Sequence, residues 1–339
     1  MLAPVIRMAP PATAPVLQDR FGRRIDYLRV SVTDRCDLRC TYCLPKGFRG
    51  FHEPRHWLNF DEWARLIGAF AARGVRRVRL TGGEPLLRRD LPLLAARLKA
   101  LPGLADLSLS TNATQLARHA VALRQAGVDR LNISLDTLDA AAAVSITGRD
   151  CLDDVMAGID AAQAAGFAPI KLNMLVMAGV NEDEVVPMAE FALARGLVLR
   201  LIERMPMGRT GRAAPHVALD PLRQRLVAHF GLLPDAQELG GGPARYWRTA
   251  DGAGRVGFIT PMTQHFCATC NRVRLGVDGT LYTCLGQDHS FAFAPLLRGG
   301  ASDAELGEAI AQAIELKPER HTFNEAPERI VRFMSHTGG

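Results

Sequence analysis

The stretch Cys36-Asp-Leu-Arg-Cys40-Thr-Tyr-Cys43 places three cysteines within eight residues, in the spacing C-x3-C-x2-C. It follows the strand-like run Tyr27-Leu-Arg-Val-Ser-Val32. Three thiolates can hold three corners of a cubane iron–sulfur cluster, which leaves the fourth iron open to a small molecule. The alternative is a zinc loop, but zinc sites usually pair C-x2-C with a second pair at a distance and fill all four positions. The spacing therefore favours a cluster with one open iron.

The composition is typical of a soluble globular protein with an excess of positive charge. The chain has 339 residues, of which 48% are hydrophobic and 22% charged, and a net charge of +6. This length indicates one large domain or two, and the chain has no run of 18 apolar residues that would predict a membrane span. The positive charge favours an anionic ligand. Because no basic run carries interleaved aromatic residues, we expect a small phosphorylated ligand rather than nucleic acid.

The cysteines are odd in number and clustered. The seven cysteines fall into a triplet, a single residue and a second triplet: Cys36, Cys40 and Cys43; Cys151; Cys267, Cys270 and Cys284. This pattern indicates metal chemistry in a reducing compartment, so we expect a cytoplasmic protein. The second triplet has the spacing C-x2-C-x13-C. That spacing leaves two interpretations open, a second cluster or a zinc site with His265 or His289 as fourth ligand.

Composition also predicts how the chain is divided. Residues 1–18 are rich in alanine and proline and carry one charge, Arg7, so we predict a disordered tail over residues 1–19. The run Gly240-Gly-Gly-Pro243 marks a boundary further on. We therefore predict one domain over residues 20–235, with the first cysteine triplet, and a C-terminal region over residues 236–339, with the second.

Strand-like and helix-like segments alternate between residues 21 and 202. The predicted strands are 27–32, 77–80, 107–110, 131–135, 170–176 and 198–202, and the predicted helices are 60–72, 91–101, 114–126, 152–165 and 182–195. In the first helix, Trp63, Leu66, Ile67 and Phe70 form an apolar stripe with helical spacing. Repeated strand–helix units predict an α/β fold with a parallel sheet, either an incomplete barrel or an open doubly wound sheet.

The chemically informative segments all follow the carboxyl ends of predicted strands, where parallel barrels carry their active sites. They are the Cys36 octet, Thr81-Gly-Gly-Glu-Pro85, Ser110-Thr-Asn112, Ser134 with Asp136, and Glu203 with Met205. Agreement among five segments is stronger evidence than any one of them. In Thr81–Pro85, two glycines allow a backbone to approach a ligand closely.

The octet and the Gly-Gly-Glu-Pro segment resemble the signature of the radical S-adenosylmethionine (radical SAM) superfamily. Further stretches resemble the GTP 3′,8-cyclase family, known as molybdenum cofactor biosynthesis protein A. These stretches are Asp26–Asp34, Arg79–Pro85, Asn132–Asp136, Met156–Asp160, Phe266–Arg272 and the Gly338-Gly339 terminus. The resemblance implies an incomplete (β/α)6 TIM-type barrel of parallel strands with a C-terminal region that closes the barrel mouth. It also implies that the second triplet holds a second [4Fe-4S] cluster rather than zinc.

The resemblance further implies the activity. SAM bound at the first cluster is cleaved to a 5′-deoxyadenosyl radical, which takes a hydrogen atom from C3′ of GTP. The C3′ radical then attacks C8, and reduction gives (8S)-3′,8-cyclo-7,8-dihydroguanosine 5′-triphosphate, the first step of molybdenum cofactor biosynthesis. The expected partners are GTP, a flavodoxin- or ferredoxin-like electron donor and cyclic pyranopterin monophosphate synthase as the acceptor of the product. A homodimer is also an expectation, whereas nucleic acid and membrane are not.

The resemblance assigns roles to residues at matching positions. The SAM contacts are Tyr42, Gly83, Ser134 and Met205. The GTP contacts are Arg29, Arg79, Ser110, Lys171, Arg272, Val273 and Arg274. Residues with a part in catalysis are Cys36, Cys40, Cys43, Arg272, Arg274, Gly338 and Gly339, and the cluster ligands are the two cysteine triplets.

The chain departs from the family pattern at few positions. Ser110 replaces a common threonine and keeps the hydroxyl, and Ala113 replaces a glycine. Cys151 matches no ligand position, so we interpret it as a buried small apolar residue. Two other interpretations compete with the cyclase: another twin-cluster radical SAM maturase, acting on a peptide or sulfatase, and a non-catalytic zinc-binding interaction protein.

Overall fold

The computed structural model describes residues 16–212, 215–237 and 239–338. Six parallel strands form its central sheet, and each pairs with the next in chain order. They are β1 (Tyr27–Ser31), β2 (Arg77–Thr81), β3 (Asp106–Thr111), β4 (Arg130–Ser134), β5 (Ile170–Leu175) and β6 (Val198–Ile202). All six predicted strands are therefore confirmed, with ends that differ by a residue or so.

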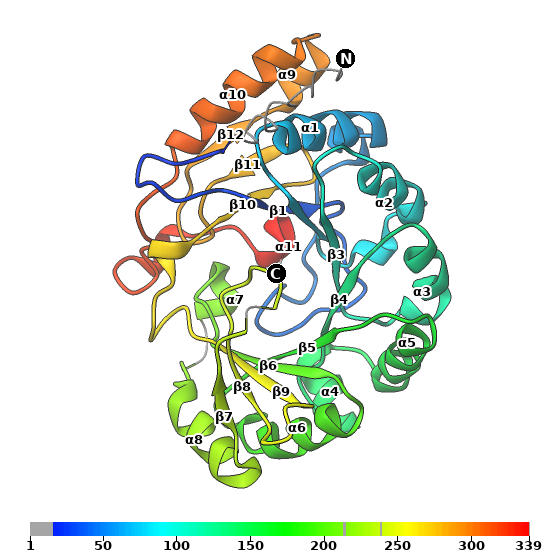
Figure 1. The fold of residues 1–339 in the computed structure, drawn as a ribbon, viewed down its shortest axis with the longest axis vertical. Coiled ribbons are helices and arrows are strands. Elements are labelled where there is room, and N and C mark those ends of the chain that lie inside the picture. The colour runs from blue at the N-terminus through cyan, green and yellow to red at the C-terminus, as the bar shows by residue number, and fades with distance from the viewer. Residues whose placement is uncertain (1–15, 213–214, 238, 339) are drawn as a thin grey trace, which may run out of the picture.

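Helices cover the outer face of this sheet, as Figure 1 shows. They are α1 (Phe60–Ala72), α2 (Leu91–Lys99), α3 (Leu116–Gln125), α4 (Ala140–Thr147), α5 (Leu152–Ala164) and α6 (Val185–Ala194). The predicted apolar stripe of α1 is buried, and a capping box between Asn59 and Glu62 fixes the start of this helix. The short helix α4 was not predicted. Its N-cap is Asp139, whose side chain accepts a hydrogen bond from the backbone of Ala142.

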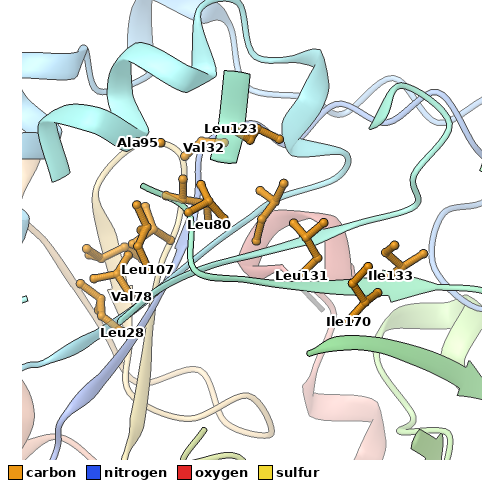
Figure 2. Packing of buried hydrophobic residues seen from close by; sticks show 14 of the residues in the cluster. Leu28, Val32, Val78, Leu80, Ala95, Leu107, Leu123, Leu131, Ile133 and Ile170 are labelled. Carbon is orange, nitrogen blue, oxygen red and sulfur yellow. The ribbon is translucent and has the colours of Figure 1, made fainter. Parts of the chain in front are cut away.

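Alternation along the strands gives the sheet an apolar face, packed on the helices, and a polar inner face. In β1 to β5, residues such as Leu28, Val78, Leu107 and Leu131 are fully buried and belong to the main hydrophobic core. Figure 2 shows these side chains packed together with Ala95 and Leu123 from the helices. Because strand side chains alternate between faces, the intervening polar residues project to the opposite, inner face.

The remaining elements come from the C-terminal part of the chain. They are α7 (Gly208–Arg212), α8 (Leu219–Phe230), β7 (Leu233–Asp235), β8 (Arg245–Arg248), β9 (Arg255–Ile259), β10 (Arg272–Leu275), β11 (Thr280–Tyr282), β12 (Ser290–Ala292), α9 (Ala294–Arg298), α10 (Asp303–Glu315) and α11 (Met334–Thr337). The strands join both edges of the same sheet, in the order β12-β11-β10-β1-β2-β3-β4-β5-β6-β9-β8-β7. β9 lies parallel to β6, and β10 lies parallel to β1.

The sheet is an incomplete barrel. Within the described residues β9 and β10 do not pair with each other, and each continues instead into antiparallel strands. α11 lies inside the ring of strands (Figure 1). The predicted α/β fold, a partial TIM-type barrel whose mouth is covered by the C-terminal part of the chain, is therefore confirmed.

One prediction about the N-terminus is wrong. Residues 16–19 were assigned to a disordered tail, but Leu17 is buried and its carbonyl accepts a hydrogen bond from the backbone of Ile25. Asp19 is also buried, in an ion pair with Arg23. The tail prediction for residues 1–15 lies outside the described residues. None of the helices in the described ranges is long and apolar enough to cross a membrane.

Candidate active site

Three arginines on neighbouring strands form a row across the inner face of the barrel. Strand register pairs Arg29 of β1 with Arg274 of β10 on one side and with Arg79 of β2 on the other. The next residue in the row is Ser108 of β3, which accepts a hydrogen bond from Arg79 Nε at 3.4 Å. Because paired residues share a face of the sheet, the register directs these cations into the barrel.

The electrostatics of this row indicate an anionic ligand. Burial lowers the pKa of Arg29, and the neighbouring cations Arg274 and Arg79 lower it further. Burial together with Arg272 lowers the pKa of Arg274 to about 9. Cations that depress one another's pKa are unfavourable together unless a negative charge compensates them. A bound polyphosphate would provide that charge.

Several donors in the barrel have no partner in the described structure. They are Arg29 Nε, Ser110 Oγ and Arg200 Nε, all buried. A buried polar group without a partner is rare and usually indicates a missing ligand or water. Arg29, Arg79 and Arg200 line one cavity of about 150 Å³, together with the run from Arg272 to Arg274, Met205 and the second cysteine triplet.

Lys171 and Arg200 extend the cationic surface to β5 and β6. Lys171 is almost fully buried, and its Nζ donates to the carbonyl of Leu239 at 2.5 Å. Burial, assisted by Arg200 and Arg130, lowers the pKa of Lys171 to about 6. Arg200 is held by a bond of 2.6 Å from Nη2 to Asn132 Oδ1. Sequence analysis missed Arg200, although a cation at the centre of the apolar strand Val198–Ile202 was a usable signal.

The first cysteine triplet lies in the loop after β1. All three thiols are free and partly buried, and burial together with Cys43, Asp136 and Cys36 raises the pKa of Cys40 well above its ordinary value. Burial raises the pKa of Cys36 to about 12 and that of Cys43 to about 11. Such thiols stay protonated without a metal and become good thiolate ligands when iron displaces the protons. The donor set therefore fits an iron–sulfur cluster with three protein ligands.

Two of the four predicted SAM contacts, Tyr42 and Ser134, line a cavity with one cysteine of this triplet. Ser134 ends β4 and shares a small cavity with Cys40 and Tyr42. The Tyr42 hydroxyl donates to Asp136 Oδ2 at 2.7 Å, which fixes the ring beside the cluster loop. Met205, beyond β6, lies instead in the arginine-lined cavity. The buried Cys151 also borders the Ser134 cavity, in agreement with its interpretation as a buried residue.

The Gly-Gly-Glu-Pro segment follows β2 and packs on the cluster loop. A methyl group on Gly83 would lie 2.6 Å from the carbonyl carbon of Arg35 and 2.9 Å from the carbonyl oxygen of Asp34, so only glycine fits. Glu84 is fully buried and accepts hydrogen bonds from Thr111 Oγ1 and the Asn112 backbone, both at 2.7 Å. Burial raises the pKa of Glu84 to about 7. Glu84 thus ties β2 to the end of β3.

The second triplet flanks β10 and β11 and lines the same cavity as the arginines. Burial alone would raise the pKa of Cys270, but Arg272 and Lys317 outweigh it and lower this pKa to about 6. Lys317 is buried, and its Nζ lies 3.5 Å from Cys270 Sγ while donating to the carbonyls of Arg272 and Thr283. Sequence analysis did not identify Lys317. The feature that could have identified Lys317 is the rarity of lysine in this chain, whose cations are nearly all arginine.

Histidines also lie beside this triplet. His265 Nδ1 lies 3.0 Å from His321 Nε2. One ligand atom each of His265, His321 and Cys267 lies within 4.8 Å of the other two. Among the described residues, this group contains Cys267 but neither Cys270 nor Cys284, so it is not the ligand set of the His265 zinc alternative. His289 is exposed, and the candidate ligand groups of the described residues do not include it.

The C-terminal tail reaches the row of arginines. Arg274 Nη1 donates to the carbonyl of Gly338 at 2.7 Å. Gly338 has a φ of +70°, and an added methyl group would lie 2.6 Å from Thr81 Oγ1, so glycine is required for both reasons. Gly339 lies outside the described residues. The barrel interior thus brings together Arg29, Arg79, the Arg272–Arg274 run and Gly338.

Comparison with known proteins gives a consistent result. The chain is 49% identical to GTP 3′,8-cyclase 1 of Pseudomonas aeruginosa, over 95% of this chain and 98% of that protein. It is 47% and 48% identical to GTP 3′,8-cyclases of Ectopseudomonas mendocina and Pseudomonas entomophila, over the same shares. Residues 30–192 match the Radical SAM superfamily, and residues 197–323 match Molybdenum Cofactor Synthesis C.

Solved structures support the fold. Streptococcus suis SuiB bound to S-adenosylmethionine superposes with a TM-score of 0.58 at 15% identity, over 84% of this chain and 67% of that chain. SuiB bound to the precursor peptide SuiA gives the same score, over 91% and 75%. At this identity the similarity concerns the architecture alone. The sequence relatives, matched over nearly their whole length, decide the assignment: the chain belongs to the GTP 3′,8-cyclase family of the radical SAM superfamily.

Proposed function

We propose that this protein converts GTP to (8S)-3′,8-cyclo-7,8-dihydroguanosine 5′-triphosphate, the first step of molybdenum cofactor biosynthesis. The observation that carries the proposal is the row Arg274–Arg29–Arg79, which lines one cavity with the second cysteine triplet. Arg29 Nε in this row is a buried donor without a partner among the described residues. A structural core would not collect mutually repelling cations. A radical SAM enzyme that acts on a nucleoside triphosphate needs them.

The first triplet belongs to the part of the site that would bind the first cluster and SAM. Cys36, Cys40 and Cys43 would bind a [4Fe-4S] cluster, and Tyr42, Gly83, Ser134 and Met205 would contact SAM. When bound, this cluster and SAM supply a 5′-deoxyadenosyl radical that can take a hydrogen atom from C3′ of GTP. The protein itself positions the reactants. The bond from Tyr42 to Asp136 and the tight packing of Gly83 on the cluster loop give that position its rigidity.

The cations hold the triphosphate. Arg29, Arg79, Arg272 and Arg274 would donate to phosphate oxygens, for which the planar guanidinium is well suited. Ser110 Oγ and the backbone of Val273 would add neutral hydrogen bonds, and Lys171 a further cation. Arg200, whose Nε has no partner among the described residues, lies in the same cavity and completes this set. Binding a polyanion would offset the repulsion between these cations.

The second triplet and the tail complete the barrel mouth. Cys267, Cys270 and Cys284 would hold a second [4Fe-4S] cluster, with an open iron suited to the guanine edge. Gly338 and Gly339 would support turnover from the end of the tail. We keep the division proposed for the chain, a barrel domain over residues 20–235 and a C-terminal region over 236–339. The family-profile boundary between residues 192 and 197 falls earlier, within the barrel.

The cellular setting follows from this chemistry. Seven free cysteines, six of them in the two triplets, require a reducing compartment, so we place the protein in the cytoplasm. Its proposed partners are a flavodoxin- or ferredoxin-like electron donor and cyclic pyranopterin monophosphate synthase, which would take up the product. We also retain a homodimer as a proposal. No nucleic acid or membrane partner is proposed.

Deuterium transfer tests the activity. The protein is reconstituted anaerobically with iron and sulfide and supplied with SAM, a reductant and GTP deuterated at C3′. Mass spectrometry of 5′-deoxyadenosine should then show deuterium. If 5′-deoxyadenosine forms without deuterium, GTP C3′ is the wrong position and the maturase alternative gains support. If none forms with both clusters assembled, the catalytic proposal fails. A colourless protein after reconstitution would favour the zinc-binding alternative.

Two variants make this test specific. Replacing Arg29 by alanine should leave reductive cleavage of SAM measurable but reduce deuterium transfer at least tenfold, because the triphosphate loses its central cation. Replacing Arg55 by alanine should change neither rate, because Arg55 is exposed and its ion pair is with the exposed Glu53. If deuterium transfer fell equally in both variants, the net positive charge of the protein, and not the row of arginines, would account for the loss.

A further inference from the structure

Three metal-ligating side chains meet next to the C-terminal tail, outside both cysteine triplets. Asp34 lies shortly before the first triplet, His52 lies in the loop that follows it, and His336 belongs to α11. One ligand atom of each lies within 4.8 Å of the other two. The fold thus brings the beginning and the end of the described chain to one point.

Two of these side chains carry atoms whose bonding is incomplete. Asp34 is fully buried, and its Oδ2 accepts a hydrogen bond of 2.6 Å from the backbone of His52 and lies 3.0 Å from His52 Nδ1. The other carboxylate oxygen, Oδ1, has no partner within the described ranges, and neither has the buried His336 Nε2. Unsatisfied buried polar atoms are costly. A single cation would satisfy both atoms together.

The donor set matches a particular class of ion. Two imidazoles and one carboxylate are ligands that Zn²⁺ and similar divalent transition metals prefer. His52 Nε2 also lies 3.8 Å from Asp278 Oδ2, at the turn between β10 and β11. Metal-bound histidines commonly direct their second ring nitrogen at a carboxylate, which orients the ring. Asp278 is in place for that role when His52 Nδ1 binds the metal.

We propose that Asp34, His52 and His336 bind one zinc-class divalent ion that fastens the C-terminal tail to the barrel. The ring centroids of His52 and His336 are 5.6 Å apart, so side-chain rotations close the site without moving the backbone far. The ion would hold α11 two residues before Gly338, whose carbonyl accepts from Arg274. It would therefore fix the end of the tail within the barrel, and three protein ligands leave room for a water molecule.

Zinc binding to the reconstituted holoenzyme tests the proposal. The chelator-treated, cluster-containing protein should take up one zinc per chain, and X-ray absorption at the zinc edge should show nitrogen and oxygen neighbours with imidazole scattering. Zinc held by the cysteines would instead show sulfur at about 2.3 Å. Affinity should fall at least tenfold in His52→Ala and His336→Ala. The matched control is His56→Ala, an exposed histidine of the same loop, which should bind as wild type.

A second measurement addresses the tail. Zinc should slow carboxypeptidase digestion of the wild-type C-terminus several-fold, and should have no effect in His336→Gln, which keeps a polar side chain of similar size. Iron content and thermal unfolding confirm that each variant is folded. Absence of zinc uptake, sulfur-only coordination, or unchanged affinity in both histidine variants would overturn the site. Zinc binding without protection of the tail would overturn the proposed role of the ion in fastening the tail to the barrel.

Discussion

Lys171 provides a prediction about stability and pH. Burial lowers the pKa of this lysine from its ordinary 10.5 to about 6, so the unfolded chain binds one more proton than the folded protein between these values. Stability of the ligand-free protein should therefore fall as the pH decreases from about 10 to 6. Lys171→Met should remove this slope and stabilise the ligand-free protein by about 1–4 kcal/mol at pH 7. Urea unfolding at pH 7 and pH 9 measures both effects.

The same variant should lose ligand affinity. A charge-assisted hydrogen bond is worth about 1.5–3 kcal/mol, so Lys171→Met should weaken GTP binding by about 10- to 100-fold. Lys46→Met, at an exposed lysine, is the control and should leave stability and GTP affinity unchanged. A variant that is less stable than wild type at both pH values would contradict the assignment of Lys171 as a buried lysine without a compensating negative charge.

Lys317 provides a prediction about reduction potential. Its Nζ lies 3.5 Å from Cys270 Sγ and is held there by two carbonyls. A positive donor at a cluster ligand favours the reduced, more negative state. Lys317→Met should therefore lower the potential of the second cluster by tens of millivolts, up to about 100 mV, since 59 mV corresponds to a tenfold change for one electron. Redox titration followed by electron paramagnetic resonance measures this shift. The first cluster is the internal control, and its potential should not change.

At the scale of structural elements, the contact between the loop after β2 and the cluster loop leaves no room for an added side chain at Gly83. Because a methyl group on Gly83 would collide with backbone atoms of Asp34 and Arg35, neither segment can yield by rotating a side chain. Gly83→Ala should displace the cluster loop and reduce the iron bound after reconstitution by about half, through loss of the first cluster. Iron analysis with thermal unfolding checks this result.

Gly68→Ala in α1 is the matched control for Gly83. Its added methyl group would only touch Leu101 at an ordinary 3.7 Å. Alanine in place of glycine within a helix should even stabilise the protein by about 0.5–1 kcal/mol. Full iron content in Gly83→Ala would show that the loop can rearrange and that the glycine is not structurally required.

The whole sheet depends on both parts of the chain. β9 and β10 cover the edges that β6 and β1 would otherwise expose, although both strands follow the predicted domain boundary at residue 235. Exposed parallel strand edges promote aggregation. We therefore expect residues 16–235 alone to aggregate or to lack a cooperative unfolding transition, as judged by size-exclusion chromatography and thermal circular dichroism. Co-expression with residues 236–339 is the control and should restore soluble, cooperatively folded protein. A stable monomer of the first fragment would support independent domains.

Local sequence patterns were sufficient for the first part of the barrel. The strands and helices between residues 27 and 202 are specified by short-range periodicity and by glycines at helix ends, which need no knowledge of distant residues. The cysteine spacings and the Gly-Gly-Glu-Pro segment are also local. For this reason the strands and the cluster loop could be predicted from local patterns, which left an incomplete barrel and an open doubly wound sheet as alternatives. The family resemblance, and not periodicity, implied the partial barrel and the positions Arg29 and Arg79.

Tertiary structure decided what depends on register and long-range contact. Arg274 lies beside Arg29 only because β10 pairs with β1, more than 200 residues earlier in the chain. Arg200 and Lys317 are candidate site residues because they are buried beside other charges. Burial of this kind cannot be predicted from a local sequence pattern. The meeting of Asp34, His52 and His336 likewise requires the tail to enter the barrel. Strand pairing and burial are properties of the packed chain, so these groups became visible only in the structure.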